Sequence, residues 1–409
     1  MMLKRWSWLT VGLLLVSSAF GFAARAEEEA SSETGLDLSL RTNAAAMPTK
    51  TADASALETV ASHMYLVDYD TGTVLASKAA DEKMYPSSMT KMMTLHIIFD
   101  GLKKGTLATN SQFTVAEKTW VSWNNRGSSM FLPINSQVSL EDLIRGIAIQ
   151  SGNDACVVAA EGIAGSEQAF AKQMNDTAKA IGMTNSNFTD STGWPSADHV
   201  TTPHDLAMLA TSLIRDFPEY YHYLSEREFT FHGIRQFNRN LLLGNASLKV
   251  DGLKTGHTEA AGYGITLSAK DPVTNRRLVL VINGMDSEAA RAQEGERLLK
   301  WGFANFKNAT VFAAGQPITP ATVWMGAARE VPLTVASSIV LSVPKTGTVS
   351  TKAAITYQSP LIAPVSKGQD VGTLTLTYAD GSSKEFSLVA GADVAKLSFF
   401  GRMGRVLGL

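Results

Sequence analysis

The chain has 409 residues, of which 45% are hydrophobic and 18% are charged, and its formal net charge is -2 at pH 7. A chain of this length and composition can bury a sizeable core and form more than one domain. The weakly acidic balance argues against nucleic acid as a partner, because nucleic-acid-binding proteins present basic surfaces.

The first 26 residues have the three parts of a signal peptide. Lys4 and Arg5 are basic, residues 8–22 are mostly apolar, and residues 24–26 read Ala-Arg-Ala, a small-x-small cleavage site. An uncleaved membrane anchor is the alternative, but the apolar run is short for a span and contains polar residues. We expect export with cleavage, which removes Lys4, Arg5 and Arg25 and changes the net charge from -2 to -5.

Two regions follow this segment. Residues 27–54 are rich in alanine, serine and charged residues, and we expect a disordered leader there. Residues 55–309 contain strand patterns at 63–70, 73–76 and 276–283, and helical patterns at 140–165, 168–181 and 288–306. This order predicts an α+β domain in which helices pack on a mainly antiparallel sheet.

A core helix is predicted from about residue 88 to residue 104. Pro86 and Ser87 give a start signal, and Gly105 gives a stop. Because residues three apart share a face of a helix, the amine of Lys91 can reach the hydroxyl of Ser88. Burial disfavours the charged form of a lysine, and a neutral amine can take the serine proton during attack on a carbonyl. An N-cap serine followed by a surface lysine is the alternative for an isolated S-x-x-K pair.

Two further polar motifs follow in the same region. Ser151-Gly152-Asn153 separates two apolar helical stretches, so its hydroxyl and amide can point into a cleft. An ordinary loop is the alternative. The stretch Lys254-Thr255-Gly256-His257 lies in a predicted strand, where glycines permit close approach of a ligand to the backbone.

Cys156 is the only cysteine of the chain, so no internal disulfide can form. It lies in an apolar run, where a buried small hydrophobic side chain is the expected reading. The seven histidines show no H-E-x-x-H and no other zinc-ligand spacing. We predict no metal and no cofactor.

Residues 310–392 are expected to form a small all-β domain. Residues 371–378 alternate between apolar residues and threonines, and a turn at 379–382 separates them from a second strand at 385–389. Within this domain, Ser342-Val343-Pro344-Lys345 also fits S-x-x-K and Lys345-Thr346-Gly347 also fits K-T-G. Pro344 favours an exposed turn, so we expect no catalytic role for this second set.

The tail, residues 393–409, is predicted to be an amphipathic helix at a membrane surface. At helical spacing its apolar residues gather on one side, while Arg402 and Arg405 project from the other. The tail is too short, and too interrupted by glycines, to span a bilayer. A terminal helix docked on the β domain is the alternative.

The order S-x-x-K, S-G-N, K-T-G along one chain resembles the signature of penicillin-binding proteins and class A β-lactamases. The longer stretches around Ser88, Ser151, Arg239 and Lys254 resemble the low-molecular-mass D-alanyl-D-alanine carboxypeptidases, and the resemblance extends over about residues 55–409. It implies a penicillin-binding transpeptidase fold. It also implies a serine enzyme that removes the terminal D-alanine of peptidoglycan stem peptides and is inhibited by β-lactams.

The resemblance also implies the roles of the motif residues. Ser88 is the acylated nucleophile and Lys91 its base. Ser151 and Asn153 relay protons and hold the substrate amide. Lys254 adds positive charge near Ser151 and helps to keep Lys91 neutral.

Substrate binding is implied for a second group of residues. Thr255 and Arg239 would bind the terminal carboxylate of the peptide. The backbone N–H groups of Ser88 and His257 would form the oxyanion hole, beside Gly256. One departure is Gly284-Met285-Asp286, where relatives often carry a basic residue after the glycine; Arg291 is nearby in the sequence.

A serine β-lactamase and a catalytically silent wall-binding protein are the rival functions. The β-lactamase would need a deacylating base, in class A a glutamate between the second and third motifs, and no glutamate lies between Glu167 and Glu219. The silent protein would lack Ser88 or Lys254, and both are present. With its signal peptide and tail, the chain is expected at the periplasmic face of the bacterial cytoplasmic membrane.

Overall fold

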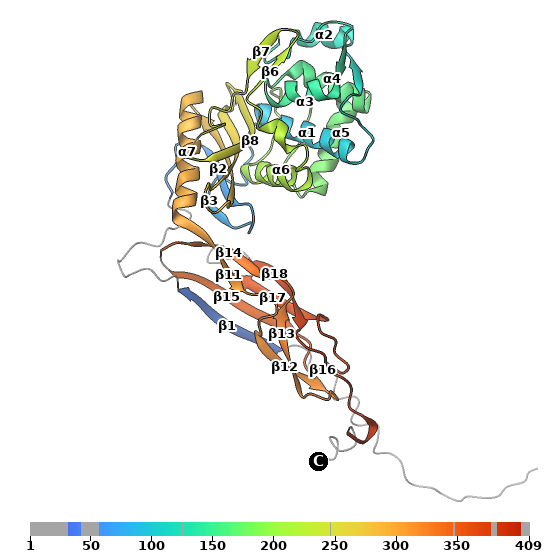
Figure 1. The fold of residues 1–409 in the computed structure, drawn as a ribbon. Coiled ribbons are helices and arrows are strands. Elements are labelled where there is room, and N and C mark those ends of the chain that lie inside the picture. Colours follow the sequence, from blue (N-terminus) through green and yellow to red (C-terminus); the bar gives the residue numbers. More distant parts are fainter. Residues whose placement is uncertain are drawn as a thin grey trace, which may run out of the picture. The chain divides into compact units, whose positions relative to one another are not determined.

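The computed structural model describes residues 32–41, 57–124, 126–245, 247–346, 348–377 and 383–401, with the backbone alone for 32–41 and 348–351. These residues belong to two compact units, coloured along the chain in Figure 1. The first unit contains residues 57–309 and 340–348. The second contains residues 32–40, 310–339 and 349–401. The signal peptide expected at 1–26 lies outside the described residues.

The first unit is built on a five-stranded antiparallel sheet. Its strand order is β3 (Val74–Lys78), β2 (His63–Asp68), β10 (Arg277–Met285), β9 (Gly262–Lys270) and β8 (Lys249–Thr258). The central strand β10 supplies Leu278, Leu280 and Ile282 to one hydrophobic cluster and Val279 and Val281 to the other. This period of two shows that both faces of the sheet are buried.

Helices cover both faces of this sheet, as Figure 1 shows. The helix α7 (Glu288–Asn305) packs against one face, on β9 and β10. On the other face lies a helical layer: η2 (Ser87–Thr90), α1 (Lys91–Lys103), α2 (Glu117–Trp123), α3 (Leu140–Ala148), α4 (Asn153–Ala164), α5 (Glu167–Ala180), α6 (Pro203–Asp216) and η3 (Tyr221–Leu224). The predicted α+β architecture is confirmed.

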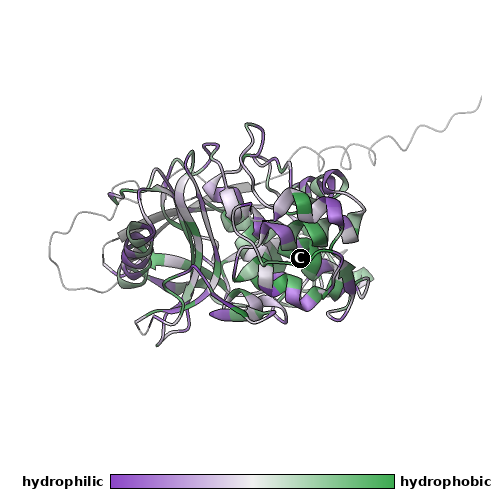
Figure 2. Cartoon of the chain, turned by 90° about the horizontal axis from the view of Figure 1, so that it is seen from above, coloured by the Kyte–Doolittle hydropathy of each residue, from purple (hydrophilic) through white to green (hydrophobic). Residues whose placement is uncertain are grey.

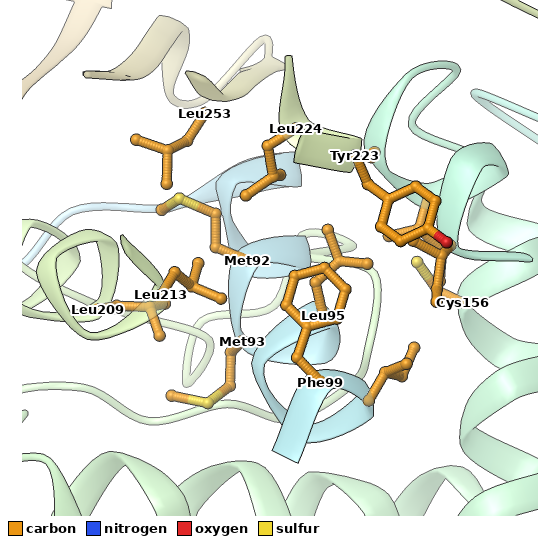
Figure 3. Packing of buried hydrophobic residues seen from close by; sticks show 14 of the residues in the cluster. Met92, Met93, Leu95, Phe99, Cys156, Leu209, Leu213, Tyr223, Leu224 and Leu253 are labelled. Carbon is orange, nitrogen blue, oxygen red and sulfur yellow. The ribbon is translucent and has the colours of Figure 1, made fainter. Parts of the chain in front are cut away.

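The helix α1 lies at the centre of the helical layer. Its residues Met92, Met93, Leu95 and Phe99 contact side chains of α6, η3 and β8 (Figure 3). Apolar residues in the strands and helices, and hydrophilic residues on outer helical turns, are visible in Figure 2. Burying a helix on all sides fixes its position, so whatever its first turn carries is held rigidly.

Short strands pair at the margins of the helical layer. They are β4 (Gln112–Thr114) with β5 (Gln137–Ser139), and β6 (Glu228–Phe231) with β7 (Ile234–Phe237). A further two-stranded sheet joins β11 (Phe306–Phe312) to β14 (Ile339–Pro344).

The second unit contains a seven-stranded sheet. Its order is β1 (Ser32–Arg41), β15 (Thr348–Tyr357), β17 (Asp370–Thr377), β18 (Ser383–Ala390), β13 (Glu330–Val335), β12 (Thr319–Trp324) and β16 (Leu361–Ile362). Leu374 and Leu376 are buried, whereas the threonines between and beside them are half-buried. The predicted pairing of this strand with residues 385–389 is present in β17 and β18.

The leader differs from the expectation of disorder, because β1 occupies residues 32–41 at the edge of this sheet. Its sequence alternates Leu36, Leu38 and Leu40 with Asp37, Ser39 and Arg41. A period of two is typical of a β-strand, and here it outweighs the low complexity of the flanking residues. The other leader residues lie outside the described part of the chain.

The tail also differs from the expectation at its start. Val394 and Lys396 form β-bridges with Val365 and Gly326, so residues 393–398 are extended and the predicted helix is wrong over that stretch. Val394 is buried, and its burial outweighs the helical pattern downstream. Residues 399–401 are helical, and residues 402–409 lie outside the described part. None of the helices among the described residues is long and apolar enough to cross a membrane.

Candidate active site

The serine and lysine of the first motif lie where η2 joins α1. Lys91 is fully buried, and its Nζ lies 2.9 Å from Ser88 Oγ, 2.8 Å from Asn153 Oδ1 and 2.6 Å from the carbonyl oxygen of Thr192. Burial is the largest effect on this amine and lowers the pKa of Lys91. The first motif therefore places the half-exposed hydroxyl of Ser88 within hydrogen-bond distance of the Lys91 amine, and burial favours the neutral form of that amine.

The hydrogen bonds of Lys91 determine where its lone pair points. Asn153 Nδ2 donates to the carbonyl of Arg126 at 3.3 Å, which leaves Asn153 Oδ1 to face the lysine. That oxygen and the Thr192 carbonyl can only accept hydrogen bonds. A neutral amine has two hydrogens to donate, and these two acceptors use both. The lone pair is then free to accept the proton of Ser88.

The Thr192 carbonyl is held in place by a loop organised around Asp190. The carboxylate of Asp190 accepts hydrogen bonds from the backbone N–H groups of Thr192, Gly193 and Trp194. Burial opposes ionisation of Asp190, but hydrogen bonds with His199 and Thr192 outweigh it and hold its pKa below the usual range. Gly193, at φ +80°, lies against Ser87, where a Cβ would lie 1.8 Å from the Ser87 carbonyl oxygen.

The second motif forms the link between α3 and α4. Ser151 has a left-handed backbone, with φ +61°, and its buried Oγ has no hydrogen-bond partner among the described residues. Its side chain lines the same cleft as Ser88 and Asn153. An unpaired buried hydroxyl costs free energy, so the site holds a polar group ready for a ligand.

The third motif lies on β8, at the edge of the five-stranded sheet and against η2. Gly256 makes this approach possible, because a Cβ there would lie 2.8 Å from the Pro86 carbonyl oxygen. Lys254 is buried, and its Nζ donates to the Thr255 carbonyl at 3.2 Å. Burial lowers the pKa of Lys254 well below its usual value, and repulsion from Lys91 and Arg239 adds to this effect. The two amines therefore disfavour a proton on each other.

Two arginines line one wall of the cleft. Arg239 donates from Nη1 to Ser128 Oγ at 2.7 Å. Arg291 is buried and donates to the Arg239 carbonyl at 3.2 Å and to Glu288 Oε1 at 2.9 Å. Burial lowers the pKa of both guanidinium groups, yet their ordinary value is so high that both remain charged at neutral pH. The paired cations suit a carboxylate.

The predicted site residues share one cleft of about 800 Å³. Its lining includes Ser88, Ser151, Asn153, Arg239, Thr255, Gly256 and His257, whereas Lys91 and Lys254 lie buried behind it. Three residues of the site lie outside the sequence motifs. Thr192 and Trp194 line the cleft, and Asp190 holds their loop in place. Arg291, which the sequence places near the departure at residues 284–286 without giving it a role, lines the cleft, whereas Met285 lines a different cavity.

The second S-x-x-K set has structural partners. Arg276 donates from Nη2 to Ser342 Oγ at 2.6 Å, and Lys345 donates from Nζ to the Phe303 carbonyl at 2.9 Å. Its serine and lysine each hold another part of the chain, so they do not form a nucleophile and base pair. Gly347 lies outside the described residues.

Cys156 is buried on α4, within the cluster around α1 (Figure 3). Burial raises the pKa of its thiol to about 12, so a nucleophilic thiolate is disfavoured. Its expected role as a small buried hydrophobic side chain is confirmed.

A sheet with helices on both faces and a Ser-Lys pair at the start of its central helix defines a serine acyl-transfer enzyme. The family model described as D-alanyl-D-alanine carboxypeptidase, peptidase S11, matches residues 49–287. The model of the penicillin-binding protein 5 C-terminal domain matches residues 306–396. The chain belongs to the peptidase S11 family of D-alanyl-D-alanine carboxypeptidases.

Individual relatives agree with this assignment. The D-alanyl-D-alanine carboxypeptidase DacC of Escherichia coli is 40% identical over 342 residues, which cover 83% of this chain and 85% of that protein. The crystal structure of penicillin-binding protein 5 from Haemophilus influenzae is 36% identical, covers 84% of this chain and 99% of its own, and has a TM-score of 0.74. Penicillin-binding protein D2 from Listeria monocytogenes, solved in an ampicillin-bound form, is 25% identical with a TM-score of 0.54 and covers 60% of this chain and 98% of its own.

Proposed function

We propose that the chain is a serine D-Ala-D-Ala carboxypeptidase that cleaves peptidoglycan stem peptides through an acyl-enzyme at Ser88. The observation that carries this proposal is the set of three contacts around Lys91 Nζ, which favours a neutral amine with its lone pair toward Ser88. A site of this kind suits acyl transfer, in which a weak nucleophile needs a base within hydrogen-bond reach.

In the first step Lys91 takes the proton of Ser88, and Oγ bonds to the carbonyl carbon between the two D-alanines. The backbone N–H groups of Ser88 and His257 are assigned to the oxyanion. The carbon–nitrogen bond then breaks, and the amine of the terminal D-alanine leaves with a proton. Ser151 is assigned to relay to the leaving amine the proton that Lys91 took from Ser88, because its unpaired hydroxyl lines the cleft beside Asn153.

Water completes the cycle by attack on the ester of Ser88. The bond from the carbonyl carbon to Oγ breaks, the hydroxyl of the water stays on that carbon, and a proton of the water passes through Lys91 to Ser88 Oγ. The shortened peptide then leaves. Lys254 supports the cycle electrostatically, since a proton on either buried lysine disfavours a proton on the other.

Thr255 and Arg239 are assigned to the terminal carboxylate, and Gly256 to substrate binding beside the oxyanion hole. A guanidinium fork matches a carboxylate in shape and charge. Arg291 supports this assignment, because it lies in the same wall and donates to the Arg239 backbone. It supplies a positive charge to this wall, whereas Met285 is uncharged, is buried in a hydrophobic cluster and does not line the cleft.

Inhibition by β-lactams belongs to the same proposal, because these drugs carry a strained amide beside a carboxylate. The ampicillin-bound form of the Listeria relative supports it. The rival β-lactamase needs a base for rapid deacylation. Glu167 accepts hydrogen bonds from Ser191 and does not line the cleft. Of the two glutamates that line it, Glu288 is paired with Arg291, and Glu259 follows the third motif instead of lying between the second and third motifs.

Export to the periplasm, with the protein held at the membrane surface by its last residues, is the proposed location. The sequence of residues 1–26 supports export. Residues 402–409 contain Arg402 and Arg405 beside apolar residues, a composition suited to an anionic membrane surface. Residues 55–309 and 310–392 are assigned as the catalytic and β domains.

The proposal is tested by incubation of the protein with acetyl-lysyl-D-Ala-D-Ala and measurement of released D-alanine. The wild-type protein should release D-alanine, and Ser88→Ala should not. Release by Ser88→Ala, or none by a folded wild-type protein, would overturn the proposal.

A further inference from the structure

Two tryptophans and an arginine form a stack beside the active-site cleft, which Trp194 lines. Trp123 is the last residue of α2, and Trp194 lies in the loop organised around Asp190. The centroids of the two indole rings are 5.5 Å apart, and the rings are nearly perpendicular, at 83°. The guanidinium carbon of Arg126 lies 5.1 Å from the ring centroid of Trp123 and 4.5 Å from that of Trp194. These distances are within the range of cation–π attraction.

The stack holds a segment that has no buried side chain of its own. The described residues between Trp123 and Ser128 are half-buried or exposed, so no buried hydrophobic side chain fixes this segment in place. The guanidinium of Arg126 forms no ion pair and no hydrogen bond with another described residue. Within the described part of the chain its charge contacts only the two rings, and the stack therefore joins the end of α2 to the Asp190 loop.

On one side, the stack positions the asparagine that faces Lys91. The Arg126 carbonyl accepts a hydrogen bond from Asn153 Nδ2 at 3.3 Å, and the Ser128 carbonyl accepts one from the Asn153 backbone N–H at 2.8 Å. A Cβ on Gly127 would lie 2.9 Å from Asn153 Nδ2, so this segment packs directly against the asparagine amide. A shift of the segment would therefore turn Asn153 Oδ1 away from Lys91 Nζ.

On the other side, the stack holds the loop that supplies the second acceptor of Lys91, the Thr192 carbonyl. The Trp194 backbone N–H donates to Asp190 Oδ1 at 3.2 Å and to Thr192 Oγ1 at 3.0 Å. The Trp194 ring also packs on the first segment, because a Cβ on Gly127 would lie 3.2 Å from it. The position of this ring and the position of the Thr192 carbonyl are therefore coupled.

We propose that Arg126 is a positioning residue for the reaction at Ser88, because its stack with Trp123 and Trp194 holds together the two segments that supply the acceptors of Lys91. This inference rests on the proposed function and adds to it a residue that does not line the cleft. Without the stack the two segments can move independently. Fewer molecules then have both acceptors directed at the amine, and the lone pair of Lys91 faces Ser88 less often.

The test measures acylation of Ser88 by benzylpenicillin in Arg126→Met, which keeps a long side chain and removes its charge. We expect the second-order rate constant to fall roughly five- to thirty-fold, the loss of two cation–π contacts. Arg126→Lys keeps a cation and should stay within about three-fold of the wild-type rate. Arg235→Met is the matched control, because Arg235 is also an exposed arginine stacked on an aromatic ring, that of Phe237, and does not line the cleft. It should keep the wild-type rate.

A double-mutant cycle separates the stack from an independent effect of the arginine. Trp194→Leu removes the ring that belongs to the Asp190 loop, and the contact that remains between Arg126 and Trp123 lies within one segment. Adding Arg126→Met to Trp194→Leu should therefore lower the rate by less than about two-fold. If the two losses simply multiply, Arg126 does not act through the stack and the proposal is overturned.

A pair of substrates decides whether Arg126 acts on the base or on carboxylate binding, because Ser128 Oγ also accepts a hydrogen bond from Arg239. Arg126→Met should slow the hydrolysis of thioester substrates with and without a terminal carboxylate by the same factor. A loss confined to the substrate with the carboxylate, a wild-type rate in Arg126→Met, or a loss explained by a lower unfolding midpoint in denaturant would overturn the proposal. A wild-type protein that benzylpenicillin does not acylate at Ser88 would instead overturn the proposed function.

Discussion

Asn153 Oδ1 lies 2.8 Å from Lys91 Nζ and faces it because Asn153 Nδ2 donates to the Arg126 carbonyl. The asparagine thereby accepts one of the two hydrogens of a neutral lysine. Burial lowers the pKa of Lys91, so its neutral form is more abundant than for a lysine in water. The acylation rate should rise with pH through this pKa, since only the neutral amine accepts a proton.

Asn153→Asp should move that rise to higher pH. A carboxylate within hydrogen-bond reach favours the charged ammonium and should raise the pKa of Lys91. The measurement is the second-order rate constant of acylation by benzylpenicillin between pH 5 and pH 10. Asn153→Leu serves as the uncharged comparison. If Asn153→Asp leaves the midpoint where it is in the wild-type protein, Lys91 is not the group that titrates.

Benzylpenicillin should add its full mass to the protein and the adduct should persist for minutes, because no glutamate of the loop between the second and third motifs lines the cleft. Peptide mapping should locate the adduct on Ser88. The matched control is Ser342→Ala, which removes the serine of the second S-x-x-K and should keep the adduct. Mass spectrometry over time decides this, and a signal cleared within seconds would favour a β-lactamase.

Arg239→Ala should lower kcat/KM for peptides ending in D-Ala-D-Ala by about ten- to one-hundred-fold, the cost of one charge-assisted hydrogen bond. Acylation by an ester or amide that lacks the terminal carboxylate should change much less, since the guanidinium has nothing to bind there. Arg235→Ala is the comparison, because its guanidinium pairs with Glu228 on the β6–β7 hairpin and does not line the cleft. Equal losses on both substrates would reject the carboxylate role.

Phe99→Ala should lower the free energy of unfolding of the first unit by about 3–5 kcal/mol, because the ring is fully buried in the cluster of Figure 3 and its removal leaves a cavity. The measurement is an unfolding curve in denaturant, in which the loss of penicillin acylation reports the unfolding of the first unit. Val121→Ala, at a side chain that is 68% exposed, should change stability by less than about 0.5 kcal/mol. A comparable loss in both variants would contradict the burial argument.

Truncation after Gly401 should release the mature protein from anionic vesicles and leave acylation intact. This cut retains Val394 and Lys396, whose bridges tie the chain to Val365 and Gly326, and removes only the tail beyond the described residues. Sedimentation with vesicles is the measurement. A truncated protein that still sediments would place any membrane contact elsewhere.

The sequence predicted the parts of the site that depend on local geometry. Ser88 and Lys91 meet because they are three positions apart in a helical turn, where η2 joins α1. The partner of Lys91 from the loop is a main-chain carbonyl, and every residue has one, so no residue type marks Thr192. Arg291 was hard to assign because its position depends on the packing of α7 on the sheet and not on spacing.

In the fold, too, local patterns predicted structure where nearby residues determine it and failed where distant segments pair. The alternation of Leu374 and Leu376 predicted the hairpin of β17 and β18, since each strand buries one face. The helix predicted for the tail is wrong at residues 393–398. There the chain pairs with Val365 and Gly326, which are distant in the sequence, and this pairing outweighs the helical pattern. Tertiary pairing of that kind leaves no trace in a local period.

The Thr192 carbonyl has a consequence for how this site can change by mutation. Substitution of a side chain cannot delete a backbone oxygen, so one acceptor of the catalytic lysine is shielded from point mutation at its own position. Its placement depends on Asp190, whose carboxylate binds three successive N–H groups of the loop. Mutations that weaken Lys91 as a base without changing Lys91 itself are therefore expected at Asp190 and Gly193. A single substitution at either position can displace the Thr192 carbonyl oxygen.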